Sequence, residues 1–273
     1  MRRRAGLQWG WVVILVGLAP VLSACGGNDG ATSSANPTAN GIPPAGDLTV
    51  AAAADLQFAF VEIGAIFEEN TGQKVIFSFG STGNLATQIE EGAPFDVFAA
   101  ANVSFVDGLV EKGRIIADSK ELYAVGRIVV AGNKEAGVNP QTLEDLLDPA
   151  IEKVAIANPD HAPYGLAAKE ALISAGIWDE IQPKLVFGEN IRQTLQFIQT
   201  GNAEAGIVAL SIAEVPEITY TLIDDALHNP LLQAMGVVTG TPHEQAARAF
   251  VAYVISDEGQ AILAKYGFQS PNH

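Results

Sequence analysis

Residues 48–72, LTVAAAADLQFAFVEIGAIFEENTG, read as a short β-strand that leads directly into an amphipathic helix. The strand is a continuous run of small and β-branched residues, which is typical of a strand buried on both faces. After it, apolar side chains recur at helical spacing, at Ala59, Ile63, Ile66 and Phe67. The helix is expected to end at the Asn-Thr-Gly sequence of residues 70–72. A strand followed at once by a helix indicates an α/β protein.

The same alternation continues along the chain in two series. The first series predicts strands over 74–79 and 96–100, and helices over 85–91 and 103–112. The second predicts strands over 153–157, 184–187 and 205–210, and helices over 165–175 and 190–200. A longer apolar run over 122–131 is broken by Gly126. A short capped helix is expected from Thr142, and the C-terminal segment over 242–266 is expected to be largely helical. Two series of this kind predict two lobes, each a mainly parallel sheet flanked by helices, with a ligand cleft between them.

The N-terminal residues have the pattern of a secretory signal. Arg2, Arg3 and Arg4 precede an almost unbroken apolar stretch over 9–22, and Leu-Ser-Ala stands directly before Cys25. The single cysteine of the chain is expected to be the lipidated first residue of the mature protein; the alternative is a chance free thiol. Residues 25–46 contain almost no large apolar side chains and are expected to form a flexible tether after a signal peptide over 1–24.

The charge of the chain excludes several classes of partner. The formal net charge is −16, and removal of the three arginines of residues 1–24 leaves −19. A protein this acidic is a poor candidate for binding nucleic acid or an anionic membrane surface. Any anion site must therefore rely on local donors.

Residues 79–89, FGSTGNLATQI, place small and hydroxylated residues directly before a helix. The stretch lacks the lysine of a phosphate-binding P-loop, the glycine spacing of a dinucleotide fingerprint and the Gly-x-Ser-x-Gly pattern of a nucleophile elbow. Two interpretations remain, a plain helix cap and a helix start whose amides and hydroxyls hold a free anion.

Three further strand-to-helix turns have a similar composition: Asp55 after four alanines, residues 158–165 (NPDHAPYG) and residues 188–192 (GENIR). Asp55 could be a helix cap or could stand beside a bound anion. His161 is expected to be structural, or hydrogen-bonded within its own loop, because the four histidines show no metal-ligand spacing; no metal or cofactor is expected. Hydrogen bonds from neutral donors to a charged acceptor contribute about 1.5–3 kcal/mol each, so five or six would give roughly 10 kcal/mol before desolvation costs.

Over most of 47–270 the sequence resembles the periplasmic molybdate-binding proteins of ABC importers. The resemblance is carried, in order, by the residue 48–72 stretch, FGSTGNLATQIEEGAPFDVFAAA (79–101), AIANPDHAPYGLAAKEAL (155–172), GENIRQTLQFIQTGNAEAGIVALS (188–211) and KYGF (265–268). It implies the two-lobed type II periplasmic binding-protein fold, with 47–125 and 220–273 in one lobe and 126–219 in the other. By position it implies oxyanion contacts from Ala54, Asp55, Ser81, Thr82, Tyr164 and, through its backbone N–H, Ile191.

The chain departs from that family at two positions. Many members have a serine where this chain has Asp55, and a tyrosine where it has Ala209; Tyr164 is a candidate for supplying the missing phenol. The ligand is therefore either molybdate or tungstate with Asp55 turned away, which the resemblance favours, or a protonated oxyanion such as hydrogen phosphate with Asp55 facing it. A sulfate or phosphate receptor is the alternative function, and a secreted hydrolase is the rival from another class.

The resemblance also implies where the protein acts. It implies a monomer without enzymatic activity, anchored through a lipid on Cys25 and facing the periplasm or the extracellular side. The partners would be an ABC permease and its ATPase. The lobes are expected to close on the ligand, with hinges near 124–127 and 216–224.

Overall fold

The computed structural model describes residues 46–271, which fall within one compact unit of the chain, Gly41–His273. The predicted signal peptide, Cys25 and all of the predicted tether except Gly46 lie outside the described residues. No helix within 46–271 is long and apolar enough to cross a membrane.

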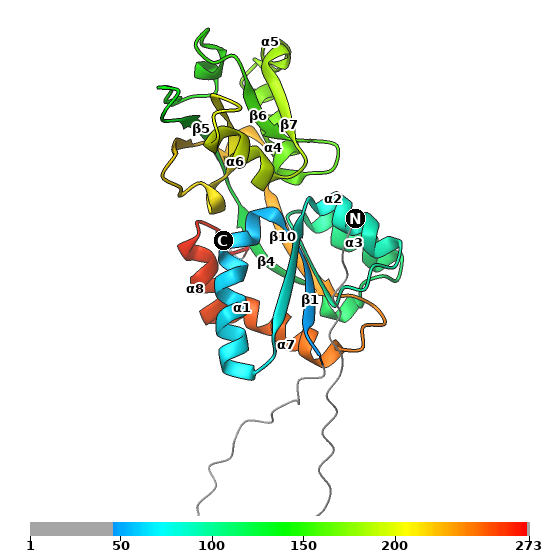
Figure 1. Ribbon diagram of the computed structural model, residues 1–273. Coiled ribbons are helices and arrows are strands. Elements are labelled where there is room, and N and C mark those ends of the chain that lie inside the picture. The colour runs from blue at the N-terminus through cyan, green and yellow to red at the C-terminus, as the bar shows by residue number, and fades with distance from the viewer. Residues whose placement is uncertain (1–45, 272–273) are drawn as a thin grey trace, which may run out of the picture. The chain divides into compact units, whose positions relative to one another are not determined.

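The first lobe is built on a five-stranded sheet of order β2-β1-β3-β10-β4 (Figure 1). Its strands are β1 (Leu48–Ala53), β2 (Val75–Gly80), β3 (Val97–Ala100), β4 (Glu121–Gly126) and β10 (Leu231–Val237). Strand β1 is the predicted buried strand, and five of its six residues are buried. Its last residue, Ala53, is paired with Gly80 of β2, so the turns that follow both strands lie side by side.

The second lobe repeats this plan with a sheet of order β7-β6-β8-β5-β9. Its strands are β5 (Ile128–Asn133), β6 (Val154–Ala157), β7 (Leu185–Gly188), β8 (Ala205–Ala209) and β9 (Ile218–Leu222). Ala157 of β6 is paired with Gly188 of β7, so this lobe also brings two strand-to-helix turns together.

The predicted α/β, two-lobed fold is confirmed, with one refinement in the sheets. Each sheet is mixed rather than mainly parallel, since two of its four strand pairings are parallel and two are antiparallel. The cause is one reversed strand in each sheet, β10 in the first and β5 in the second. Both of these strands belong to the segments where the chain passes between the lobes, outside the strand–helix alternation.

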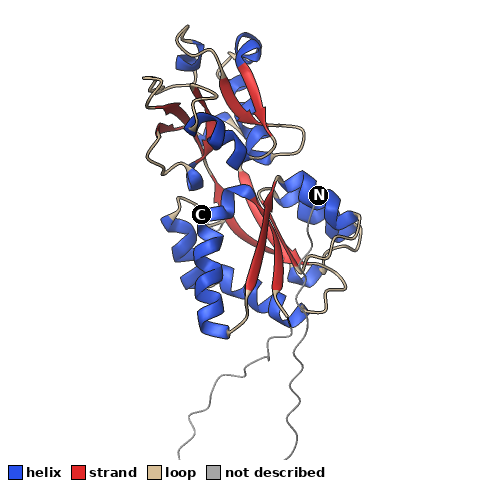
Figure 2. Cartoon of the chain, in the orientation of Figure 1, coloured by secondary structure: helices blue, strands red, loops and turns tan. Residues whose placement is uncertain are grey.

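Helices cover the sheets of both lobes (Figure 2). In the first lobe, α2 (Thr82–Glu90) and α3 (Val103–Glu111) pack against each other and on the sheet, and α1 (Gln57–Thr71), α7 (Glu244–Ile255) and α8 (Asp257–Lys265) form a second group. In the second lobe, α4 (Pro163–Ser174) packs on β5, β6 and β8, and α6 (Ile191–Gln199) packs on β5 to β8. The short helix α5 (Trp178–Ile181) follows α4. Every residue of β6 is buried, as the predicted sheet covered on both faces requires.

The chain passes from the first lobe to the second after β4 and returns between β9 and β10. The predicted lobe boundary at 219–220 falls inside β9, which pairs with β5 of the second lobe. The boundary differs because the whole of β9 pairs with β5, so the chain returns to the first lobe only after Leu222. The segment from Thr142 forms a short 3₁₀ helix, Glu144–Leu147, and the predicted C-terminal helix is divided at Ser256 into α7 and α8.

Candidate functional site

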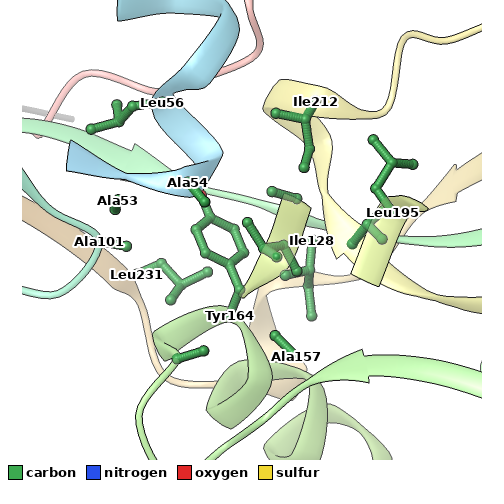
Figure 3. Close-up of a cluster of buried hydrophobic side chains, with 14 of the residues drawn as sticks. Ala53, Ala54, Leu56, Ala101, Ile128, Ala157, Tyr164, Leu195, Ile212 and Leu231 are labelled. Carbon is green, nitrogen blue, oxygen red and sulfur yellow. The ribbon is translucent and has the colours of Figure 1, made fainter. Parts of the chain in front are cut away.

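The four predicted turns each follow a strand: the 3₁₀ turn Ala54–Leu56 follows β1, α2 follows β2, α4 begins after β6, and α6 begins after β7. In open α/β sheets the carboxyl ends of parallel strands are where ligands usually bind. All six predicted contact residues are buried, with exposed fractions of 5% or less: Ala54, Asp55, Ser81, Thr82, Tyr164 and Ile191. Figure 3 shows the ring of Tyr164 directed from the second lobe toward Ala54 of the first.

The lobes touch where the start of α2 meets the loop between β6 and α4. The Gly83 amide donates to the His161 carbonyl over 2.9 Å, and the Ser81 hydroxyl lies 3.0 Å from His161 Nδ1. The Asn84 carboxamide donates to Glu189, whose carboxylate lies 3.8 Å from His161 Nε2. We call these five residues the interlobe latch. The His161 ring therefore contacts Ser81 across the lobes, which corrects the prediction that it is hydrogen-bonded within its own loop; a structural role was the other expectation.

Ser81 stands at the N-cap position of α2, but its hydroxyl makes no capping hydrogen bond. Asp55 likewise does not cap its turn, where the N-cap residue is Ala53. The plain-cap interpretation of these two side chains is therefore wrong, because both make their contacts elsewhere. Thr82 accepts a hydrogen bond from the Ala101 amide at 3.1 Å, which leaves its hydroxyl proton available to another acceptor.

Helix-start amides are the second feature of these turns. The first amides of a helix have no partner within the helix. Among the described residues, no group accepts a hydrogen bond from the amides of Thr82, Tyr164 and Ile191. The Asn190 side chain caps α6 by accepting hydrogen bonds from the amides of Arg192 and Gln193, and it leaves the Ile191 amide without a partner from this cap. Three buried helix starts thus offer the partial positive charge that favours an anion.

A buried polar cluster links the lobes behind these turns, and it consists of Asp55, Tyr123, Tyr164 and Gln233. The Gln233 Nε2 donates to Asp55 Oδ2 at 2.8 Å and to the Tyr164 hydroxyl at 3.0 Å. Its Oε1 accepts from Tyr123 at 2.7 Å. The backbone carbonyl of Asp55 also accepts a bond from Ser211 of the second lobe at 2.8 Å. Asp55 and Tyr164, predicted as site residues from different lobes, therefore share one partner.

The pKa values of Asp55, Tyr123 and Tyr164 are all raised in this cluster. Burial raises the pKa of Asp55 from 3.8 to about 6, although hydrogen bonds from Gln233 and Tyr164 act in the opposite direction. Burial, and then the nearby Asp55, raises the pKa of Tyr123 and Tyr164 well above the ordinary value. Asp55 Oδ1 is buried and has no hydrogen-bond partner among the described residues. A buried oxygen of this kind is costly unless it is protonated or meets a donor.

The sequence did not point to Tyr123 or Gln233. Gln233 lies in β10, a strand that the alternation did not predict, and the only available signal is a polar residue inside the apolar run LLQAMGVV of 231–238. Ala209 ends β8 and is buried. The prediction that Tyr164 supplies a phenol to the ligand stays a prediction, because the Tyr164 hydroxyl accepts a hydrogen bond from Gln233 in the buried polar cluster.

Within 46–271, no group of three His, Cys, Asp or Glu side chains is placed to hold a metal ion. A surface hollow of about 890 Å³ lies where β4 and α8 meet, and its lining includes Leu122, Gln260 and Phe268. None of the predicted contact residues lines it. The predicted contact residues therefore lie away from this hollow.

The interlobe latch gives a first testable prediction. His161→Ala removes its ring contacts and should speed ligand release about 5- to 30-fold, because one or two hydrogen bonds contribute about 1–2 kcal/mol. Stopped-flow dissociation of the bound ligand measures this rate. Asp160→Ala, an exposed change in the same loop, is the matched control and should leave the rate unchanged. Equal rates for wild type and His161→Ala would show that the latch does not hold the lobes together.

Comparisons with known proteins agree with this geometry. The family model for bacterial extracellular solute-binding proteins matches residues 48–269, and the chain belongs to this family. Within it, the chain is 36% identical over 242 residues to the molybdate-binding protein ModA of Rhodobacter capsulatus, covering 88% of this chain and 95% of that protein. It is 35% identical to the putative ABC transporter substrate-binding lipoprotein YvgL of Bacillus subtilis, covering 81% and 85%.

A solved structure supports the same family relationship. The Azotobacter vinelandii periplasmic molybdate-binding protein superposes with a TM-score of 0.78 at 26% identity, covering 82% of this chain and all of that one. These relatives are named as binding proteins rather than as enzymes.

Proposed function

We propose that this chain is the extracytoplasmic receptor that captures molybdate or tungstate and delivers it to an ABC importer. The observation that carries the proposal is a set of three buried helix starts, Thr82, Tyr164 and Ile191, whose amides have no acceptor among the described residues. The turns that carry them are joined across the lobes by hydrogen bonds. The names of the relatives and the matching solved structure support the same ligand class.

The chemistry of the turns suits a tetrahedral dianion. The amides of α2, α4 and α6 supply partial positive charge, and the hydroxyls of Ser81 and Thr82 add neutral donors. No ion pair of the described residues involves any of the six predicted contact residues. A site of this type holds an oxyanion in a chain with a net charge of −16 without placing a full positive charge against it.

Ser81→Ala tests this site directly. Loss of one hydrogen bond to a charged oxygen should weaken molybdate binding about 10- to 150-fold, which corresponds to about 1.5–3 kcal/mol. Titration calorimetry with molybdate, tungstate, sulfate and phosphate measures both affinity and selectivity. Ser78→Ala, which changes an exposed serine on β2, the strand that precedes Ser81, is the control and should bind as the wild type does. Tight binding of phosphate alone would replace the proposed ligand by the alternative one.

The phosphate alternative is kept because of Asp55. Its unpaired Oδ1 could accept the proton of a hydrogen phosphate if the carboxyl is ionised and faces the ligand. Molybdate or tungstate is preferred because several relatives that match over most of the chain carry the molybdate-binding name.

A hydrolase is the second candidate. The His161 ring lies between the Ser81 hydroxyl and the Glu189 carboxylate, which is the spatial order of a nucleophile, a base and an orienting acid. The long 3.8 Å separation of His161 and Glu189, and their origin on the lobe opposite Ser81, favour a latch that separates when the lobes open. Turnover of a chromogenic ester that is lost in Ser81→Ala would support the enzyme, whereas the receptor predicts no turnover in either protein.

The finer placement of the protein also belongs to this proposal. Cys25 would carry the lipid that keeps a monomeric receptor on the outer face of the cell membrane, beside a permease and its ATPase, and no cofactor is needed. The Bacillus subtilis relative is named a lipoprotein, which supports the anchor. A Cys25→Ser chain that remains membrane-bound and acylated would contradict it.

A further inference from the structure

Asp55 is the one acidic side chain among the predicted contact residues, and its two oxygens have different surroundings. Its side chain is buried, and Oδ2 accepts the Gln233 amide at 2.8 Å. Oδ1 is equally buried but has no partner among the described residues. One oxygen is therefore engaged by Gln233, and the other has no hydrogen-bond partner within the described part of the chain.

Gln233 is held in the orientation that donates to Asp55. Its Oε1 accepts from the Tyr123 hydroxyl at 2.7 Å, and Tyr123 also lies 3.1 Å from the Ala100 carbonyl. Because Oε1 is engaged in this way, Nε2 is the atom that meets Asp55 and Tyr164. The same arrangement keeps Oδ2 of Asp55 as an acceptor and leaves Oδ1 as the oxygen that can carry a proton.

Among the described residues, no full positive charge acts on Asp55. The elements packed against its turn are β2, α1, α6 and the 3₁₀ turn Leu210–Ile212, and the titratable groups of the polar cluster are Tyr123 and Tyr164. On α6, the Arg192 guanidinium stacks over Phe58 and bonds to Gln199, and on α1, Glu62 pairs with Lys265. Burial without a counter-charge favours the neutral carboxyl, and the raised pKa of about 6 agrees with it.

A bound dianion strengthens this preference. An ionised carboxylate next to an oxyanion repels it, whereas a carboxylic acid can donate its O–H to an oxyanion oxygen as a serine hydroxyl would. A neutral Asp55 would therefore reconcile its acidic side chain with an oxyanion site.

We propose that Asp55 binds the oxyanion as a neutral carboxylic acid, with Oδ1–H as the donor, so that ligand capture takes up one proton from solvent whenever Asp55 is ionised beforehand. This inference rests on the proposed function. It makes Asp55 a specificity-determining residue that favours fully deprotonated oxyanions, and it differs from both earlier possibilities, in which Asp55 turns away or accepts a proton from the ligand.

The test is calorimetric titration of the purified protein with molybdate, and separately with tungstate, from pH 6.5 to 8.5. Affinity of the wild type should fall about tenfold per pH unit above pH 7, because only the protonated fraction binds. The binding enthalpy, measured in buffers of different ionisation enthalpy, should report uptake of close to one proton at pH 8. Asp55→Asn keeps a donor but cannot ionise, so its affinity should not change with pH and should exceed that of the wild type at pH 8.

The outcomes separate this inference from the function beneath it. Wild-type affinity that does not change with pH, without proton uptake, would overturn the role of Asp55 and leave the receptor intact. Tight phosphate binding that Asp55→Asn abolishes would also overturn it, because Asp55 would then be an acceptor. Absence of molybdate and tungstate binding in both proteins at every pH would contradict the proposed function itself.

Discussion

Asp55→Asn is expected to stabilise the ligand-free protein at pH 8 by up to about 3 kcal/mol, which corresponds to a rise of roughly 6–12 °C in Tm. The pKa of Asp55 is raised from 3.8 to about 6 by burial, so folding favours its protonated form. The stability that this group contributes is fully present below pH 3.8 and is lost as the pH rises through 6. Asparagine cannot ionise and avoids that loss, so the difference in Tm between the two proteins should grow as the pH rises from 4 to about 6 and then stay constant up to pH 8.

Asp96→Asn is the matched control because Asp96 is also a buried aspartate of the first lobe. Its carboxylate accepts bonds from the Thr49 amide and hydroxyl, from Thr241 and from His243. Removal of a charge that is hydrogen-bonded in this way should destabilise the protein, so the same substitution is expected to have opposite signs at the two positions. Destabilisation by Asp55→Asn at pH 8 would mean that the buried carboxylate is satisfied in solution, contrary to the structure.

Gly126→Ala is expected to weaken oxyanion binding about 5- to 150-fold. Gly126 ends β4, where the chain crosses to the second lobe, and a Cβ there would lie 2.2 Å from the Tyr164 hydroxyl and 2.8 Å from Gln233 Nε2. Both side chains are fully or almost fully buried, so they have little room to move. Overpacking of this kind costs about 1–3 kcal/mol, and here it would destabilise the conformation in which the two lobes are in contact. Calorimetry gives the affinity, and small-angle scattering with and without ligand gives the compaction.

Two further variants show whether the clash is the cause. Gly126→Ala combined with Tyr164→Phe removes the hydroxyl that lies closest to the new methyl group. This double variant should recover part of the compaction that the protein shows on binding ligand. Gly108→Ala, on α3, meets open space and should be neutral or slightly stabilising. Wild-type affinity in Gly126→Ala would show that the contact between Gly126 and Tyr164 is not needed for binding.

Most of the fold could be predicted from the sequence because its elements are locally encoded. The strand and helix of residues 48–72 carry their own apolar periodicity, and the structure places β1 at Leu48–Ala53 and α1 at Gln57–Thr71. Strands β9 and β10 were not predicted, because they pair with partners far away in sequence and have no α-helix between them. The mixed pairing of both sheets follows from the same long-range contacts and could not be inferred from periodicity.

The candidate site was predictable in its backbone and less so in its side chains. Small residues before a helix mark the turns at Ser81 and Ile191, since both the composition and the helix start are local. The partners of Asp55 could not be found in this way, because Gln233 lies 178 positions away and Tyr164 lies in the other lobe. The cross-lobe bond of His161 to Ser81 was missed for the same reason.

The most direct test of the central claim is the position of the metal atom in a crystal of the protein grown with tungstate, located by its anomalous scattering. We expect one tungstate between the lobes, with its oxygens within about 2.7–3.2 Å of the Tyr164 and Ile191 amides and of the Ser81 hydroxyl. A tungsten atom bound only elsewhere, or none in the presence of saturating tungstate, would contradict the oxyanion site that these turns define.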